Sequence, residues 1–351
     1  MNYKNKLIST VVIQLIVLLI FMLIINRNDP FLYYNSNWET KIIHLNNSNY
    51  QNPGILKNFH YDSFITGTSM TQNFNVDEAN TLFNASFVKT PIAGGSFYDI
   101  NKLKNVAFNN RKINNVIQAI DYSMIKIGHE TSNVKEVSYY LYDNNIFNDI
   151  YYLLNIDVMC SIVKNYLNYN FFHMDPIDNF NEAYTWHQHW KFSKDTVLKN
   201  YKRQEIKQST NKLDENTIDN IRKNINNNLK QQAIDNPDTN FYFFFTPYSI
   251  LYYDELFLKS EYDAFYEIKD IVVGELIAQE NIKLFSFELE DDIIYNLDNY
   301  KDVAHYSDKI NSRILQYMSK DKYLLTADNY KEILKKEKIM ISNVNFDQLY
   351  E

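Results

Sequence analysis

Short apolar runs alternate with amphipathic stretches over most of the chain. The runs are four to seven residues long and end at polar or turn residues, which is typical of strands buried on both faces of a sheet. Phe241–Phe245, with the sequence FYFFF, is the clearest of them. The predicted strands are Ser63–Thr66, Ala85–Thr90, Asn114–Ile120, Phe241–Phe245 and Ile282–Phe287.

The stretches between these runs carry apolar residues at helical spacing. Ile218, Ile221, Ile225 and Leu229 lie three or four residues apart and form one apolar stripe on an otherwise polar helix. Similar spacing predicts helices over 76–83, 99–108 and 268–276. Strands that alternate with helices imply right-handed crossovers. We therefore expect an α/β fold with a doubly wound parallel sheet of about five strands, flanked by helices.

Residues 7–25, LISTVVIQLIVLLIFMLII, are apolar and uncharged. A helix of this length spans about the thickness of the hydrocarbon core of a bilayer. Lys4 and Lys6 precede it, whereas Arg27 is soon followed by Asp29, so the positive-inside rule places the N-terminus in the cytoplasm. A cleaved signal peptide is the alternative, but its apolar region is usually shorter and a small-x-small cleavage site should follow. We expect an uncleaved single-pass anchor in the cell membrane.

The composition changes along the chain predict its organisation. Residues 1–6 form a cytoplasmic tail, and the polar, aromatic residues 26–58 form a juxtamembrane connector. The alternating pattern occupies 59–320, with an insertion over about 122–201 that is rich in Tyr, Asn and Trp. Residues 321–351 remain as a C-terminal extension.

Charge and cysteine content exclude two classes of function. The net charge is −8 and no long basic run is present, so a nucleic-acid partner is not expected. Cys160 is the only cysteine, which excludes an intrachain disulfide and a cysteine-rich metal site. Because it lies in the apolar run LLNIDVMCSIV, we expect a buried, inert thiol.

Ser69 lies in ITGTSMTQNF, after the first predicted strand and before a helix. Serine there is either a helix cap or a nucleophile exposed at a strand end, and this segment alone favours the cap. Thr71 stands where a Gly-x-Ser-x-Gly elbow would have its second glycine, so that motif is absent.

A second group of candidates follows other predicted strands. In NYKDVAHYSDK, Asp302 and His305 are three residues apart, so the aspartate can hold the histidine in one tautomer. An ordinary surface loop and a metal-binding pair are the alternatives. Gly94, in TPIAGGSFYD, permits a close backbone approach to an oxyanion, or marks a plain turn. All these positions lie at the carboxyl ends of strands, where parallel sheets place their sites.

These three segments together resemble the SGNH (GDSL-like) hydrolase superfamily over roughly residues 59–320. Within it, the chain is similar to the membrane-anchored branch of alginate O-acetyltransferase-like proteins and the DltD proteins that D-alanylate lipoteichoic acid. The resemblance implies a flavodoxin-like three-layer fold without a cofactor. It also implies Ser69 as nucleophile, His305 as base, Asp302 as its orienting group, and the N–H groups of Ser69 and Gly94 as oxyanion donors.

One block of the sequence departs from the superfamily pattern. An asparagine usually completes the oxyanion hole after the third strand, but this chain reads VIQAIDYSM. Asp121 or Tyr122 takes that place. A carboxylate would repel an oxyanion, whereas the Tyr122 hydroxyl could donate to it.

The segment TWHQHW is the other candidate for binding. His187 and His189 could hold a metal, but no third ligand is identifiable, and no metal site is expected. Trp186 and Trp190 could stack on sugar rings or simply pack. With Tyr248 they are the candidates for contacts with substrate.

The sequence thus predicts a membrane-anchored, extracytoplasmic serine O-acyltransferase or esterase. Its acyl group would be acetyl or similarly small, and its acceptor a cell-surface polysaccharide or teichoic-acid-like polymer. A membrane-bound acyl donor protein is the partner that the resemblance implies. Two alternatives stay open: a non-catalytic SGNH-fold protein that binds glycan or scaffolds surface-polymer assembly, and a plain secreted lipase or esterase.

Overall fold

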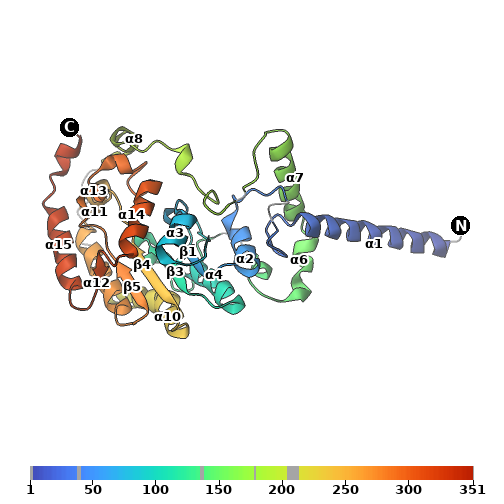
Figure 1. The fold of residues 1–351 in the computed structure, drawn as a ribbon, viewed down its shortest axis with the longest axis horizontal. Coiled ribbons are helices and arrows are strands. Elements are labelled where there is room, and N and C mark those ends of the chain that lie inside the picture. Colours follow the sequence, from blue (N-terminus) through green and yellow to red (C-terminus); the bar gives the residue numbers. More distant parts are fainter. Residues whose placement is uncertain (1–2, 38–40, 135–137, 178, 204–212, 351) are drawn as a thin grey trace. The chain divides into compact units, whose positions relative to one another are not determined.

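The computed structural model describes two compact units in the 351-residue chain. The described residues are 3–37, 41–134, 138–177, 179–203 and 213–350. The N-terminal unit comprises Met1–His60 and Glu136–Ala183, and the sheet unit comprises Tyr61–Lys135 and Tyr184–Glu351. Figure 1 shows the ribbon of both units, coloured along the sequence from the N-terminus (blue) to the C-terminus (red).

The sheet unit is built on six strands in the order β2-β1-β3-β4-β5-β6. The first five pair in parallel, and β6 pairs antiparallel to β5. The strands are β1 (Ser63–Thr66), β2 (Phe87–Lys89), β3 (Asn115–Ile120), β4 (Asn240–Phe245), β5 (Ile282–Phe285) and β6 (Leu324–Leu325). The predicted α/β class with a mostly parallel sheet is therefore confirmed.

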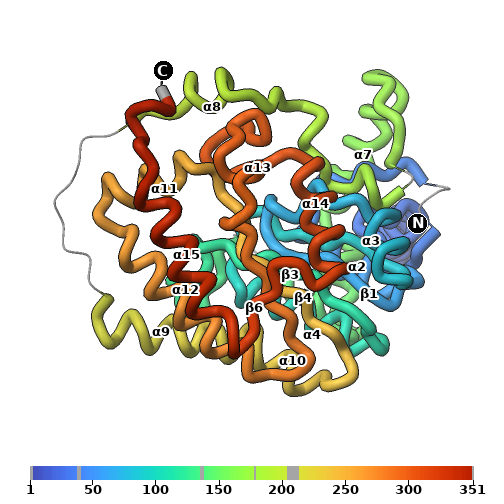
Figure 2. Tube along the Cα trace, turned by 60° about the vertical axis from the view of Figure 1, so that its left-hand side comes forward, coloured from blue at the N-terminus to red at the C-terminus, as the bar shows by residue number. Residues whose placement is uncertain are grey.

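Helices cover this sheet in two groups. In the first group, α3 packs against α14. In the second group, α9, the π-helical turn η5 and α12 contact one another, and α4 and α10 contact η5. Helix α15 packs along α12 in this second group (Figures 1 and 2). The main helices are α3 (Val76–Phe83), α4 (Phe97–Asn110), α9 (Glu215–Ile225), α10 (Gln231–Asp235), α11 (Ile250–Leu258), α12 (Tyr262–Leu276), α14 (Asp308–Met318) and α15 (Tyr330–Ser342), with η5 at Asn226–Lys230. Shorter ones are α5 (Tyr122–Ile125), α8 (Lys194–Asn200) and α13 (Asp291–Ile294).

The FYFFF run explains why both faces of the sheet are covered. Phe241 meets Phe108 of α4 with ring centroids 6.1 Å apart, whereas the next residue, Tyr242, meets Phe83 of α3 at 5.0 Å. Successive side chains of a strand point to opposite faces, so an aromatic run requires a helical layer on each side. The three layers follow from this pattern.

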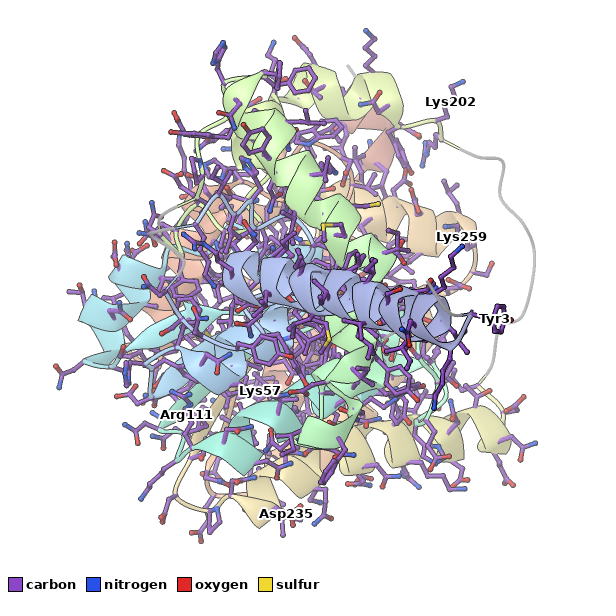
Figure 3. The ribbon with its side chains drawn as sticks, turned by 90° about the vertical axis from the view of Figure 1, so that its right-hand side faces the viewer. Tyr3, Lys57, Arg111, Lys202, Asp235 and Lys259 are labelled. Atoms are coloured by element: carbon purple, nitrogen blue, oxygen red, sulfur yellow. The ribbon has the colours of Figure 1, made fainter. Side chains whose placement is uncertain are left out.

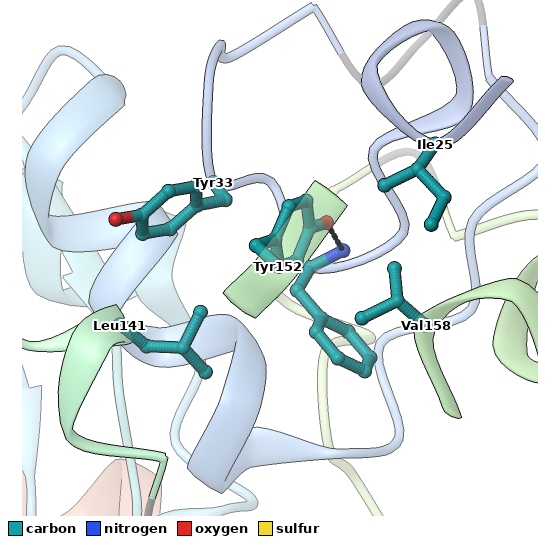
Figure 4. Packing of buried hydrophobic residues seen from close by; sticks show 6 residues of the cluster. Ile25, Tyr33, Leu141, Tyr152 and Val158 are labelled. Atoms are coloured by element: carbon teal, nitrogen blue, oxygen red, sulfur yellow. Dashed lines mark hydrogen bonds between the residues drawn. The ribbon is translucent and has the colours of Figure 1, made fainter. Parts of the chain in front are cut away.

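The N-terminal unit is helical. Its helices are α1 (Tyr3–Asn28), α2 (Ser48–Asn58), α6 (Ile150–Leu153) and α7 (Ile156–Asn170), with 3₁₀ turns η2 (Tyr139–Leu141) and η3 (Ile146–Asn148). Its buried core, drawn in Figure 4, joins residues from both of its chain segments. The core residues are Ile25, Phe31, Tyr33, Leu141, Tyr152 and Val158.

Helix α1 is long and apolar enough to cross a membrane, a property that signal sequences share. Tyr3 marks its N-terminal end in Figure 3. Its other end is fastened to the core of the unit. The buried carboxylate of Asp29 accepts hydrogen bonds from the Tyr33 N–H at 2.8 Å and from the Tyr152 hydroxyl at 2.9 Å.

The structure adds detail to three stretches whose fold the sequence did not reveal. The stretch 26–58 contains α2. The stretch 122–201 is divided, with 136–183 in the N-terminal unit and 122–135 and 184–201 in the sheet unit. The stretch 321–351 supplies β6 and α15 to the sheet unit.

The prediction of a buried Cys160 is wrong. Its thiol is exposed on α7, because that helix buries only Val158 and Asn165 among its residues. An apolar run in sequence indicates burial only where a partner surface covers every side of the helix.

A buried ion cluster fixes α15 to the sheet unit. The ammonium of Lys269 on α12 lies 2.7 Å from Glu288 Oε1, just after β5, and 2.8 Å from Glu337 Oε2 on α15. All three side chains are almost completely inaccessible. Burial lowers the pKa of Lys269, but the two carboxylates more than compensate and raise it overall.

We predict that Lys269→Met destabilises the protein, because it leaves two buried carboxylates facing each other without a cation. The expected loss in free energy of unfolding is about 3–5 kcal/mol, measured by chemical denaturation. Lys335→Met removes an exposed lysine from the same α15 and should change the stability by no more than about 0.5 kcal/mol. A Lys269→Met protein as stable as the parent would contradict the role given to the cluster.

Candidate active site

The loop after β1 presents Ser69 at the start of a 3₁₀ turn, η1 (Ser69–Thr71). Gly67 has a φ of +143°, and a Cβ there would lie 2.7 Å from the Thr71 side chain, so this tight turn requires glycine. The N-cap of the turn is Thr68, whose hydroxyl accepts from the Met70 N–H. The cap of α3 is Asn75. Ser69 caps neither helix, and the cap interpretation favoured by the local sequence is wrong.

The side chains of Ser69, His305 and Asp302 form one hydrogen-bonded line. Ser69 Oγ lies 3.0 Å from His305 Nε2. The other ring nitrogen, His305 Nδ1, lies 2.9 Å from Asp302 Oδ2 and 3.0 Å from Oδ1. An Nδ1–H that donates to this carboxylate leaves Nε2 free to accept the proton of the serine hydroxyl. The structure therefore joins residues 236 positions apart in the sequence.

The loop that carries His305 is held by the neighbouring strand-end loops. The buried Tyr300 hydroxyl donates to the Pro247 carbonyl at 2.7 Å, and the Ser249 hydroxyl donates to the Val303 carbonyl at 2.8 Å. These bonds fasten it to the loop after β4. Asn311 of α14 donates to the Met70 carbonyl at 3.0 Å, which ties the far end of the same segment to the turn of Ser69.

Asp302 is held as a carboxylate. Burial raises its pKa, but the His305 ring and the backbone N–H groups of Ala304 and His305 donate to it and lower the pKa to about 2. The N–H bonds are 2.9 Å and 2.8 Å long. The ammonium of Lys301 lies 3.8 Å from the same carboxylate. An ionised Asp302 stabilises a positive charge on the imidazole.

Asp121, after β3, lies behind the turn of Ser69. Its buried carboxyl accepts from the Thr68 hydroxyl at 2.6 Å and from the Tyr248 hydroxyl at 3.0 Å. Burial raises its pKa, and the hydroxyl donors only partly offset this. Asp121 therefore fixes the residue next to Ser69. Its position after a strand was the only sequence signal for this role, and sequence reasoning missed it.

Tyr122 and Tyr248 lie elsewhere than the sequence alone suggested. The ring of Tyr122 packs on Phe265 of α12 at a centroid distance of 4.8 Å. Tyr248 is buried, with its hydroxyl on Asp121 and its ring 4.2 Å from that of Tyr252.

Gly94 lies in the loop beside that of Ser69. The Ile92 N–H donates to the Gly67 carbonyl at 2.7 Å, which joins the loops after β2 and β1. Gly94 is exposed and has a φ of +69°, a backbone conformation that favours glycine.

The segment TWHQHW, residues 185–190, packs on Ser69 and His305 through Trp186. The Trp186 indole N–H donates to the Ser69 carbonyl at 3.2 Å, and its ring meets the His305 ring edge-on at 5.5 Å. Asn73, which sequence reasoning did not select, accepts from the backbone N–H of Trp186 at 3.1 Å. The Lys301 ammonium lies over the Trp186 and Trp190 rings, 4.5 Å and 4.1 Å from their centroids.

The two histidines of this segment form the turn η4 (His187–His189). Within the described residues, no three His, Cys, Asp or Glu side chains are grouped as metal ligands would be.

Comparisons with known proteins give little. No protein-family model matches the sequence, and no curated protein matches it. Among solved structures, the chain is similar to one from Streptococcus pneumonia that is provisionally described as a platelet activating factor. The two share 10% identity over 78% of this chain and 90% of the other, with a TM-score of 0.39. That score is too low to carry an argument, so function is inferred from the geometry of the site.

We predict that the stabilising effect of Asp302 disappears in acid. Its folded pKa of about 2 is below the value of roughly 3.9 for a free aspartate, so its contribution is complete above the free value and is lost as pH falls toward 2. The difference in unfolding free energy between parent and Asp302→Asn should shrink as pH falls from about 5 toward 2.

The control for this measurement is Asp328→Asn, an exposed aspartate in the turn before α15. Its unfolding free energy should differ little from that of the parent at any pH in this range. A difference in unfolding free energy for Asp302→Asn that grows as pH falls from about 5 to 2 would contradict the assignment of a depressed pKa.

Proposed function

We propose that the chain is a membrane-anchored serine acyltransferase or esterase of the SGNH-hydrolase type. The observation that carries this proposal is the line from Ser69 Oγ through the His305 ring to the Asp302 carboxylate, with contacts of 3.0 Å and 2.9 Å. A serine, a base within hydrogen-bond reach and a carboxylate that orients the base are the groups that nucleophilic acyl transfer requires.

The proposed reaction has two halves. His305 Nε2 takes the proton of Ser69 as its Oγ attacks the carbonyl carbon of an acyl ester. The tetrahedral intermediate then expels the alcohol, which leaves with the proton that His305 returns, and the acyl group stays on Ser69. In the second half, His305 deprotonates an acceptor hydroxyl or water, which attacks the acyl-serine and restores the free serine. Asp302 balances the charge on the imidazolium in both halves.

The backbone N–H groups of Ser69 and Gly94 are the proposed oxyanion donors. The bond from Ile92 to Gly67 places their two loops side by side, which supports this pairing. Asp121 opposes this pairing less than its place in the sequence suggests, because burial raises the pKa of its carboxyl and so favours the neutral form. Removing an oxyanion donor typically costs about 3–4 kcal/mol of transition-state stabilisation, so two backbone donors contribute strongly.

We also propose that α1 is an uncleaved anchor, with the short N-terminus in the cytoplasm and both units outside. Ile25 belongs to the core of the N-terminal unit, and Asp29 accepts bonds from Tyr33 and Tyr152. Cleavage just after the apolar segment would remove Ile25 and leave that core open. A signal peptide is not normally built into the domain that it exports.

The proposed substrate is an acetyl or similarly small acyl ester, and the proposed acceptor is a hydroxyl of a cell-surface polysaccharide or teichoic-acid-like polymer. Trp190 supports a sugar acceptor, since half of its surface is exposed next to the loop of the triad and aromatic faces stack on sugar rings. A membrane-bound protein that delivers the acyl group is the partner proposed by family resemblance.

We predict that a fluorophosphonate labels Ser69 stoichiometrically in the folded protein. Ser69→Ala should abolish labelling, and His305→Ala should slow it by at least about 10³-fold because the hydroxyl then lacks its base. Ser342→Ala, an exposed serine of α15, is the matched control and should label like the parent. No labelling of folded protein would overturn the proposal in favour of a non-catalytic glycan-binding protein.

We predict that the acyl-ester content of the surface polymer depends on Ser69. Cells that produce Ser69→Ala at the parent level should carry no more acyl ester than cells without the protein, as measured by release with mild base. If the parent hydrolyses simple esters rapidly but polymer acylation is unchanged in Ser69→Ala cells, the proposed polymer substrate is wrong and the protein is a plain esterase.

A further inference from the structure

Exposed apolar side chains outside α1 gather in one part of the N-terminal unit. Across the described residues, the exposed large apolar side chains outside α1 all lie between Tyr139 and Met174, except Trp190, Ile234 and Ile339. Those in this part are Tyr139, Ile146, Phe147, Ile150, Tyr151, Leu154, Ile156, Val163, Tyr166, Leu167, Tyr169, Phe171, Phe172 and Met174. A soluble surface rarely exposes so many large apolar side chains within one stretch of chain without a partner.

Helix α7 has two apolar stripes, of which its own unit uses one. On one face, Val158 belongs to the core and Ile162, four residues later, packs against it. The polar Asn165, three residues further on, is buried on the same face. The second stripe, at the same spacing, is exposed and consists of Ile156, Cys160, Val163 and Leu167. A polar stripe separates them, consisting of Asp157, Ser161, Lys164 and Asn168.

This exposed stripe is attached to the end of α1. Helices α6 and α7 both contact α1. Ile25 of α1 shares a core with Tyr152 of α6 and Val158 of α7 (Figure 4). Where α1 leaves a bilayer, α6 and α7 are therefore at the level of the membrane surface. Continuity with a membrane-spanning helix identifies lipid as the occupant of the patch.

The dimensions favour a position in the interface over a second crossing. Helix α7 has 15 residues, or roughly 22 Å at the usual rise, which is shorter than the hydrocarbon core of about 30 Å. Together with the segment Ile146–Leu153 before it, α7 is long and apolar enough to cross, but the two pieces are bent by 55° to each other, so they do not form one straight span. Exposed aromatic residues such as Tyr166, Phe171 and Phe172 suit the boundary between headgroups and acyl chains.

We propose that α6 and α7 form a second membrane contact, with the stripe Ile156–Cys160–Val163–Leu167 inserted into the lipid–water interface. The inference rests on the proposed anchoring by α1 and adds to it. Two attachments restrict the tilt of the N-terminal unit on the bilayer, whereas a single helix would leave it free to swing.

The test uses the only cysteine of the chain, which lies in the inserted stripe. The full-length protein is labelled at Cys160 with an environment-sensitive fluorophore and placed in nanodiscs of phosphatidylcholine and phosphatidylglycerol. The matched control, Cys160→Ser with Ser161→Cys, moves the probe one residue, or about 100° around the helix, to the polar stripe. Lipids brominated near the headgroup should quench the probe at 160 at least about 2-fold more strongly than the probe at 161.

Three outcomes would overturn the inference. Equal, weak quenching at both positions would show that α7 is exposed to water, and it would leave the proposed anchoring by α1 unaffected. Blue-shifted emission at 160 without lipid quenching would show that protein, such as a second copy, covers the stripe. Protein that does not enter nanodiscs would refute the anchor and the second contact together. Fluorophosphonate labelling of the same samples reports on Ser69 separately, so a failure here is distinguishable from a failure of the proposed chemistry.

Discussion

The contact of 3.0 Å between Ser69 Oγ and His305 Nε2 is the interaction on which the proposed site depends. In the sheet, β3 and β4 separate the strand before Ser69 from β5, the strand before His305. The loop after β5 must therefore return across the carboxyl edge. Bonds from Tyr300 to Pro247 and from Ser249 to Val303 hold it on that path. The site is thus a product of strand order and loop fastening together.

Two carboxyl groups near this histidine have opposite environments. Asp302 accepts N–H bonds beside a lysine and stays ionised, whereas burial raises the pKa of Asp121. Asp302 stabilises a positive charge on the imidazole. Asp121 accepts from the Thr68 hydroxyl and so fixes the residue before the proposed nucleophile. Separating the pKa values of neighbouring acids in this way is a common means of giving each a different role. Trp186 adds a third restraint, since its indole N–H binds the Ser69 carbonyl.

Periodicity predicted the five main strands and the layers because apolar runs report burial directly. The sequence order also indicated that loops bearing Ser69, Gly94 and His305 share one edge, since all follow parallel strands. What could not be predicted depends on contacts between distant segments. The two-residue β6 has no periodicity, and Thr68 is identified as the cap of η1 only by its geometry. Cys160 is exposed because α7 has two apolar stripes but packs only one, which a hydrophobic run alone does not disclose.

In the proposed reaction, Ser69 carries the acyl group between donor and acceptor. Peptide mass spectrometry after brief exposure to p-nitrophenyl acetate and acid quenching measures this directly. We expect one acetyl increment on the peptide that contains Ser69. The increment should be absent when the protein is unfolded in denaturant before exposure, since only the folded chain brings His305 to the serine. If the folded protein releases p-nitrophenol but the acetyl group is found on another residue, or on none, Ser69 is not the acyl carrier.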